Sequence, residues 1–312
     1  MDILKNIEVP TGNILIVKGE LGKLECLSLG DYGKDVNLNQ HKKVIHTDIL
    51  PLSKKWVCTI STQYGCSSGC KFCDVPKCGS GINATLNDLL NQVMMVKSMH
   101  DDIKTCGRFN IHYARMGEPT WNTAVLDSAI LLKYELSDFL VHPVVSTMMP
   151  RKNENLARFI WAWCHIKNEY YNGEAGLQLS INSTNDKERI AMFSGNALDL
   201  VSISKIMRTM PKPVGRKYTL NFAIAGYEID AEYLARLFDP RDFICKLTPM
   251  HKTASALKNG IETNGDYTES YPYEEYESTL KDVGFDVLTF IASKEEDDSR
   301  ITCGNAILAD RE

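Results

Sequence analysis

The stretch WVCTISTQYGCSSGCKFC, residues 56–73, joins a short apolar run to a loop that carries three cysteines within eight positions. The run WVCTIS is rich in aromatic and β-branched residues, which is typical of a strand. Cys66, Cys70 and Cys73 then follow with the spacing CxxxCxxC. Tight cysteine clusters of this kind are usually metal sites. The stretch therefore predicts a metal-binding loop that directly follows a strand.

The number of thiols in this loop bears on the kind of metal site. A closed structural zinc site or a ferredoxin-type cluster takes four protein ligands, whereas three leave one metal position open to another molecule. Cys78, five residues after Cys73, keeps a closed four-thiolate zinc site as the alternative interpretation. The loop by itself does not decide between the two.

Beyond this loop, short apolar runs alternate with helical segments. The segment TLNDLLNQVMMVKSM places leucines on one helical face and begins with a possible capping box of Thr85 and Asp88. Such alternation predicts βα units around a parallel sheet, wound into a barrel or open. The expected strands are WVCTIS from residue 56, FNIHYA from 109, HPVVST from 142, GLQLSI from 176, YTLNFAIA from 218, FICKLTP from 243 and VLTFIA from 287.

The N-terminal part has a different pattern. NILIVKGELGKLECLSL, residues 13–29, has two β-rich runs around a glycine-containing turn, which predicts a hairpin. We therefore expect residues 1–50 to form a small N-terminal β-hairpin extension. Residues 51–312 would form the α/β domain with a late cysteine loop.

Composition narrows the class of protein. Of 312 residues, 44% are hydrophobic and 24% are charged, as in globular proteins, and neither a signal peptide nor a membrane span is recognisable. We expect a cytoplasmic protein, in which ten cysteines favour metal binding and catalysis over disulfides. A net charge of -5 argues against a protein whose main role is to grip a long polyanion.

Polar loops follow most of the predicted strands. RMGEP follows the second strand, STMMP the third, NSTND the fourth and PMHK the sixth. In parallel sheets, ligands bind at the carboxyl ends of the strands. These loops should therefore converge with the cysteine loop on one site.

Four motifs in this order resemble the radical S-adenosylmethionine (SAM) superfamily, and within it the RlmN/Cfr-like rRNA adenine methyltransferases. They are STQYGCSSGCKFC, MGEPTWN, SINSTND and ITCGNA, spread over residues 56–312. The resemblance implies a partial (β/α)6 TIM-like barrel of radical SAM type. It also implies a 4Fe-4S cluster on Cys66, Cys70 and Cys73, with SAM at the open iron.

The resemblance further assigns contacts to SAM. Gly117 and Glu118 match the pair that receives the SAM ammonium group, a charge-assisted contact. Asn182 stands where the family has histidine, so it keeps a donor and an acceptor without a titratable group. The other implied SAM-binding residues are Phe72, Ser146, Ser180, Ile181 and His251.

Two further cysteines would take part in the family's chemistry. Cys303, followed by Gly304 and Asn305, resembles the cysteine that accepts a methyl group from one SAM. A radical from a second SAM would then remove a hydrogen from this methyl group, and the resulting carbon radical would add to the substrate ring. Thr59 occupies the place of the family's resolving cysteine. Cys58 beside it is the expected substitute, although neighbouring strand residues face opposite ways, and Cys78 is another candidate.

These residues favour a radical SAM methyltransferase that acts on an sp2 carbon of an adenine-like or other aromatic substrate. The substrate would be RNA or a nucleotide-like small molecule, although no counterpart of the family's N-terminal RNA-binding domain is expected. A flavodoxin or ferredoxin would donate electrons. The alternatives are a radical SAM enzyme with another hydrogen abstraction, and a non-catalytic zinc-binding interaction protein.

Overall fold

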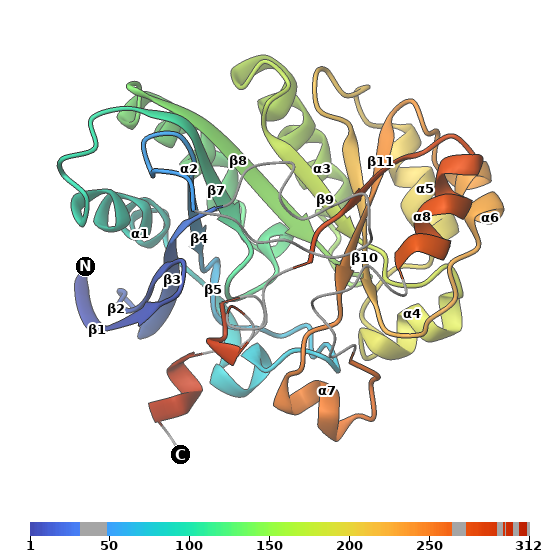
Figure 1. The fold of residues 1–312 in the computed structure, drawn as a ribbon, viewed down its shortest axis with the longest axis horizontal. Helices are drawn as coiled ribbons and strands as arrows, with labels where there is room; N and C mark the ends of the chain where they lie inside the picture. The colour runs from blue at the N-terminus through green and yellow to red at the C-terminus, as the bar shows by residue number, and fades with distance from the viewer. Residues whose placement is uncertain (32–48, 264–272, 292–295, 297, 302–305, 311–312) are drawn as a thin grey trace.

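A single large sheet forms the centre of the fold in the computed structural model, which describes residues 1–31, 49–263, 273–291, 296, 298–301 and 306–310 (Figure 1). Within these residues, ten strands pair in the order β1-β2-β3-β4-β7-β8-β9-β10-β11-β12. Neighbouring strands from β4 to β12 all run parallel. Their bounds are β4 (Trp56–Ile60), β7 (Cys106–Tyr113), β8 (Phe139–Thr147), β9 (Gly176–Ser180), β10 (Tyr218–Ile224), β11 (Phe243–Pro249) and β12 (Asp286–Thr289).

Helices connect the parallel strands, as the alternating pattern predicted. They are α1 (Leu86–Ser98), α2 (Ala124–Glu135), α3 (Leu156–His165), α4 (Asp186–Met192), α5 (Leu200–Arg208), α6 (Ala231–Leu237), α7 (Ala254–Lys258) and α8 (Tyr273–Asp282). The predicted capping box of Thr85 and Asp88 is present at the start of α1. Within the described ranges, no helix is both long and apolar enough to cross a membrane.

The two faces of the parallel strands differ sharply. On the outward face, side chains such as Phe109, Ile111 and Leu220 are fully buried and pack against the helices in the main hydrophobic core. The alternate residues form the inward face, where most side chains are polar and half-buried, although Val57, Val144 and Ile244 also face inward. This pattern places the main apolar core outside the sheet and most polar side chains inside it. The polar residues of the inward face are Thr59, Asn110, His112, His142, Ser146, Gln178, Ser180, Thr219, Asn221, Lys246 and Thr248.

Three N-terminal strands extend the sheet beyond β4. The predicted hairpin is confirmed as β2 (Gly12–Lys18) and β3 (Lys23–Gly30), which pair antiparallel. An unpredicted strand, β1 (Asp2–Val9), lies outside β2 at the edge of the sheet, and its register with β2 shifts between Ile3 and Lys5. Because β3 also pairs with β4, these strands continue the main sheet. The domain boundary near residue 50 stays a prediction.

Candidate functional site

The cysteine loop lies between two short strands, β5 (Gln63–Gly65) and β6 (Ser80–Asn83), just after β4. Gly65 has a φ of 77°, and a Cβ there would lie 2.2 Å from the carbonyl oxygen of Gly79. Glycine is therefore required at this turn. The Cys66 N–H donates to the same Gly79 oxygen at 3.2 Å and closes the loop. The fold thus positions the loop at the carboxyl end of the first parallel strand, as predicted.

Loops that follow β9 and β11 hold the cysteine loop from two sides. On the β9 side, the Asn196 side-chain amide donates to the Ser68 carbonyl at 2.8 Å, and the Lys71 N–H donates to the Met192 carbonyl at 2.9 Å. On the β11 side, the Thr253 hydroxyl donates to the Phe72 carbonyl at 2.7 Å. These bonds satisfy backbone groups of the loop and fix its path.

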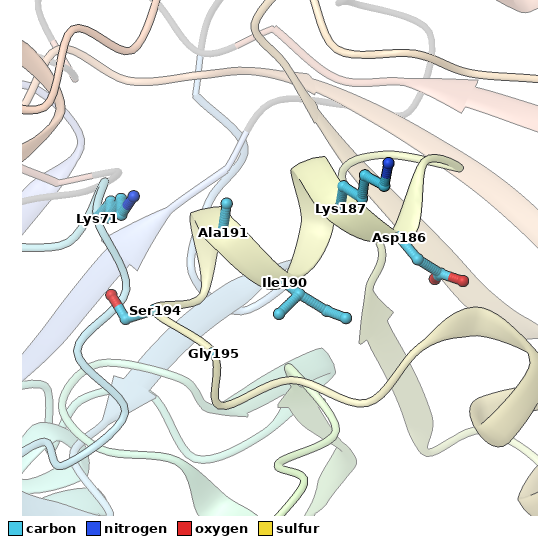
Figure 2. Close-up of a pocket in the computed structure, with 7 residues that line it drawn as sticks. All are labelled: Lys71, Asp186, Lys187, Ile190, Ala191, Ser194 and Gly195. Atoms are coloured by element: carbon cyan, nitrogen blue, oxygen red, sulfur yellow. The ribbon is translucent and has the colours of Figure 1, made fainter.

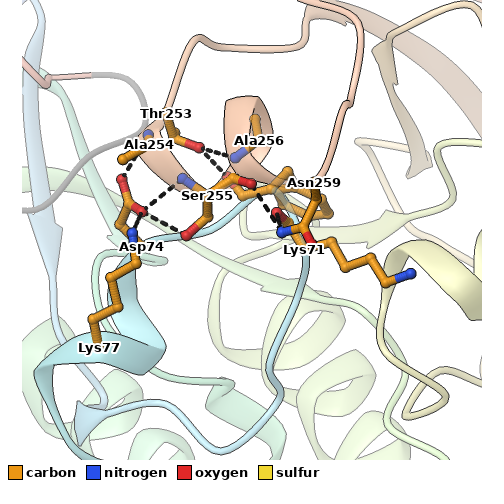
Figure 3. A network of polar contacts seen from close by, with 9 residues as sticks. Lys71, Asp74, Lys77, Thr253, Ala254, Ser255, Ala256 and Asn259 are labelled. Carbon is orange, nitrogen blue, oxygen red and sulfur yellow. Dashed lines mark hydrogen bonds and ion pairs between the residues drawn. The ribbon is translucent and has the colours of Figure 1, made fainter.

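Figure 3 shows how Asp74 strengthens the contact with α7. Its carboxylate accepts hydrogen bonds from the Ser255 hydroxyl at 2.6 Å and the Ser255 N–H at 3.0 Å, and it pairs with Lys77 at 2.5 Å. These bonds outweigh partial burial and hold the pKa of Asp74 below its usual value. Asp74 therefore stays ionised and ties the cysteine loop to the start of α7.

The three predicted thiol ligands are half-buried and lie near one another. Burial, followed by the proximity of Cys73, Cys66 and Glu118, raises the pKa of Cys70 well above its usual value. A bound metal would reverse this effect, because thiolates are the form that binds iron. Among the residues that the structure describes, no three histidine, cysteine or acidic side chains converge on one metal ion.

Glu118 is a buried carboxylate within electrostatic range of Cys66 and Cys70. It accepts hydrogen bonds from the Thr120 hydroxyl at 2.7 Å and from the Met148 N–H at 3.0 Å. Burial raises its pKa, although these hydrogen bonds oppose the shift. A cation bound beside the cysteines would stabilise this carboxylate, which is the role that the sequence predicted for it.

Gly117 explains how Glu118 reaches this position. Its φ is 95°, and an added Cβ would lie 2.5 Å from the Cβ of Gln63. The Gln63 side-chain oxygen also accepts the Glu118 N–H at 2.9 Å. A larger residue at position 117 would separate the MGEP loop from β5, so glycine allows the carboxylate to approach the cysteine loop.

The other predicted SAM contacts occupy the same end of the sheet but differ in orientation. Ser146 and Ser180 lie on the inward face, whereas the Ile181 side chain is fully buried in the core. Asn182, with a φ of 63°, accepts the Ala223 N–H at 2.9 Å. Because the Ile181 side chain is buried in the core, only the backbone of Ile181 could contact a ligand. His251 follows β11, and Phe72 packs edge-on against Phe193 with ring centroids 5.6 Å apart.

Sequence reasoning missed Arg189 of α4, whose side chain is fully buried. Its guanidinium donates to four carbonyl oxygens and lies 4.9 Å from the ring of Phe193. Burial lowers its pKa to about 10, so it stays charged at neutral pH. Arg189 thereby connects the segment that follows β8 with the end of β9. It also lies within electrostatic range of Cys70. The four carbonyls belong to Met148, Ser180, Ile181 and Leu198.

The two remaining predicted cysteines have different outcomes. Cys58 is fully buried on the outward face, and burial together with Cys26 raises its pKa well above the usual value. The Cys58 side chain thus lies on the face opposite to the candidate site, and a catalytic role for it stays a prediction. Cys303 lies outside the described residues.

An open pocket of about 560 Å³ lies beside α4 (Figure 2). Lys71 and Ser194 lie at one end of it and Asp186 at the other. None of the predicted site residues lines it. We therefore do not assign the pocket to the candidate site.

The chain is similar in sequence to curated RNA methyltransferases. It is 28% identical over 158 residues to the dual-specificity RNA methyltransferase RlmN of Campylobacter lari, which covers 50% of this chain and 42% of the relative. It is 24% identical over 258 residues to RlmN of Sorangium cellulosum, with 80% and 61% covered. The chain thus spans about half the length of the curated relatives it matches. No protein-family model matches it.

A solved structure supports the fold. A radical SAM methyltransferase from Sphaerobacter thermophilus has a TM-score of 0.65 and 17% sequence identity, with 95% of this chain and 78% of that chain covered. This likeness confirms the predicted TIM-like fold of radical SAM type. Motif order, sequence relatives and fold agree: the chain is similar to radical SAM enzymes of the RlmN/Cfr-like group.

Proposed function

We propose that this protein is a radical SAM methyltransferase that methylates an sp2 carbon of an aromatic substrate. The observation that carries the proposal is the position of Glu118, buried within electrostatic range of Cys66 and Cys70 at the carboxyl end of the sheet. Three thiols and a carboxylate form the donor set expected for a cluster and the ammonium group of SAM. When bound, the cluster would supply the electron that cleaves SAM reductively.

Each residue of the site would have a distinct role. Cys66, Cys70 and Cys73 would hold the cluster as thiolates, and Glu118 would accept hydrogen bonds from the SAM ammonium group. Arg189 would hold the ends of β8 and β9 in place, and its positive charge would stabilise the ionised Cys70. Ser146 and Ser180 on the inward face, with Phe72, Asn182 and His251, would complete the SAM contacts.

The residues on either side of Cys303 are anchored near this site. Arg115 donates to the carbonyl oxygens of Arg300 at 2.8 Å and Ile301 at 2.9 Å. Glu25, which forms a buried ion pair with Arg115, accepts the Ile307 N–H at 3.2 Å. These contacts support a role for the late cysteine close to the cysteine loop. The Cys303 thiolate would displace the sulfur of SAM at its methyl carbon and so carry the methyl group.

The partners follow from this chemistry. Reductive cleavage needs a one-electron donor, and we propose a flavodoxin or ferredoxin. The relatives are named as RNA methyltransferases. RNA or a nucleotide-like molecule is therefore the proposed substrate class. Thiolate ligands and a reduced donor suit the cytoplasm, where thiols stay reduced.

Anaerobic purification followed by iron analysis and a SAM cleavage assay tests the enzyme proposal. We expect about four irons per chain and formation of 5′-deoxyadenosine with a strong reductant. Cys70→Ala should lose both iron and SAM cleavage, because one iron loses its thiolate. Cys78→Ala is the matched control from the same loop and should keep both. A colourless protein with one zinc, or equal iron loss in the two variants, would contradict the proposal.

Peptide mass spectrometry tests the methyl-carrier role separately. Protein purified with its cluster should contain S-methylcysteine at Cys303. Cys303→Ala should still cleave SAM but transfer no methyl group. If Cys303 stays unmodified and the alanine variant transfers methyl groups normally, the carrier role is wrong. SAM cleavage without any methyl transfer by the wild-type protein would favour the alternative radical SAM reaction.

A further inference from the structure

The inward face carries a cluster of basic side chains that the proposed chemistry does not use. Asn110 on β7 pairs with His142 on β8, and His112 lies two residues further along β7. Arg108 donates to the Asn110 side-chain oxygen at 3.2 Å, so it lies on the same side. The sheet register therefore brings one arginine and two histidines together on this face.

Two more basic residues reach this cluster from later in the chain. Lys246 on β11 pairs with Asn221 on β10 and faces inward. A Cβ on Gly176 would lie 3.5 Å from an Arg216 guanidinium nitrogen and 3.1 Å from Val144, which also faces inward. Arg216 thus lies against the inward face beside β8 and β9. We call Arg108, His112, His142, Arg216 and Lys246 the basic cluster.

Nearby carboxylates do not balance this charge. Glu174 and Asp31 are the acidic groups that raise pKa values within the cluster. Glu174 already lies 3.4 Å from the His142 imidazole, and Asp31 pairs with Lys55 at 2.5 Å. Arg108, Arg216 and Lys246 together carry more positive charge than Glu174 beside them offsets, and a bound anion would balance the excess.

The charges also disturb one another. Burial and the nearby Lys246, Arg216 and Arg108 lower the pKa of His112 to about 3. Burial and Arg216 lower the pKa of Lys246 to about 8. The two histidines are therefore neutral at neutral pH, and the positive charge lies on Arg108, Arg216 and Lys246. Groups with pKa values shifted in this way often occur at functional sites.

Two buried polar atoms on the same face have no hydrogen-bond partner. They are the Asn221 side-chain oxygen and His142 Nδ1, and both residues are 9% exposed. His142 Nδ1 lies 3.4 Å from a Glu174 carboxylate oxygen without hydrogen-bond geometry, and burial and Arg108 lower the pKa of His142, so the imidazole is neutral at neutral pH. Buried polar groups are normally satisfied, so an unpaired acceptor beside Lys246 indicates a missing ligand donor. His112, Thr219 and Lys246 are half-buried, so solvent reaches this face.

We propose that the basic cluster binds the phosphate group of a small nucleotide-class substrate, with Lys246 and Arg216 as its main ligands and Asn221 accepting a hydrogen bond from the same molecule. The inference rests on the proposed function, because it names the substrate class of that site. Arginine binds phosphate with two parallel hydrogen bonds, and lysine binds it as a point charge. The inward face would hold the phosphate below the aromatic ring.

Calorimetric titration of the anaerobically purified holoprotein tests this site with AMP, adenosine and inorganic phosphate as probes. AMP should bind at least about tenfold more tightly than adenosine, as expected for charge-assisted hydrogen bonds. Lys246→Gln and Arg216→Gln should each weaken AMP about tenfold or more without changing adenosine binding. Lys246→Arg should retain AMP binding. Lys205→Gln, which removes an exposed charge on α5, is the matched control and should bind like wild type.

Thr219→Asp is a second variant that does not remove a basic residue. It adds a negative charge to the half-buried inward face and should abolish AMP binding. Equal affinity for AMP and adenosine, no binding of AMP, or equal loss in Lys205→Gln would overturn the proposal. Displacement of phosphate by SAM would also overturn it, because the cluster would then serve the cofactor. SAM cleavage, measured on the same protein, reports the proposed enzyme function independently.

Discussion

The outward and inward faces of the parallel strands use alternate residues of the same segments for different purposes. On β10, Leu220 and Phe222 point outward and are fully buried, whereas Thr219 and Asn221 point inward. Burial of the outward side chains removes apolar surface from water and so stabilises the folded protein. The inward ones include a buried unpaired oxygen and partly exposed polar groups. Stability therefore depends mainly on one face, and ligand chemistry on the other.

The Glu25–Arg115 ion pair lies on the inward side of the sheet, yet we expect it to contribute to stability as the outward core does. Both side chains are buried near the inward side of β3, and Arg115 also binds two carbonyl groups. Arg115→Met should lower the free energy of unfolding by about 3–5 kcal/mol, because Glu25 keeps a buried charge without its partner. Urea denaturation measures this change.

The double variant Glu25→Gln with Arg115→Met is the control. It should be less destabilised than the sum of the two single variants, since neither buried charge remains. A loss below about 1 kcal/mol for Arg115→Met would place this pair with ordinary surface ion pairs.

Substitutions on β10 test the comparison directly. Leu220→Ala should lower the free energy of unfolding by about 2–5 kcal/mol, because it leaves a cavity in the core. Thr219→Ala, one residue away on the inward face, should change it by less than about 1 kcal/mol. Thermal or urea denaturation of both variants gives the values. Equal losses would mean that the inward face is packed as tightly as the core.

Glu118→Gln should affect binding while the cluster stays intact. Loss of one charge-assisted hydrogen bond should weaken SAM binding by about 1.5–3 kcal/mol. Equilibrium binding to the iron-loaded protein measures this. Unchanged affinity would mean that MGEP serves only as a strand-to-helix turn.

The pH dependence of SAM binding gives an independent test of Glu118. Burial raises the pKa of Glu118, and only its ionised form attracts an ammonium group. SAM affinity should therefore fall as pH decreases towards that raised pKa. Glu118→Gln should lose this part of the pH dependence, and an identical profile in the variant would exclude Glu118 as its source.

Much of the fold was predictable because its outward residues form clear apolar patterns. The runs around Phe109, Leu179 and Leu220 are strands, and α1 begins at its predicted cap. Strand β1 was missed because most of its residues are exposed, and its pairing with β2 depends on backbone hydrogen bonds. The cysteine loop and Glu118 were predicted from local motifs, and both lie at the predicted end of the sheet.

The basic cluster was not predictable in the same way. Arg108 and Lys246 are far apart in sequence, and only the register of β7 to β11 brings them to one face. Arg189 was missed for a similar reason, because its four carbonyl partners lie on three separate segments. For Cys58, the alternation of strand side chains already indicated from sequence that it would face away from Thr59, and the structure places it in the core.

The edge strand β1 also has a consequence for self-association. It covers the edge of β2, in which Ile14, Leu15, Ile16 and Val17 are buried. An apolar strand with unpaired backbone groups can recruit the same strand of another molecule. The charged residues of β1 and its irregular register with β2 make it a poor template for such pairing. Loss of β1 would expose the apolar edge strand β2, so we expect a chain without β1 to self-associate more readily.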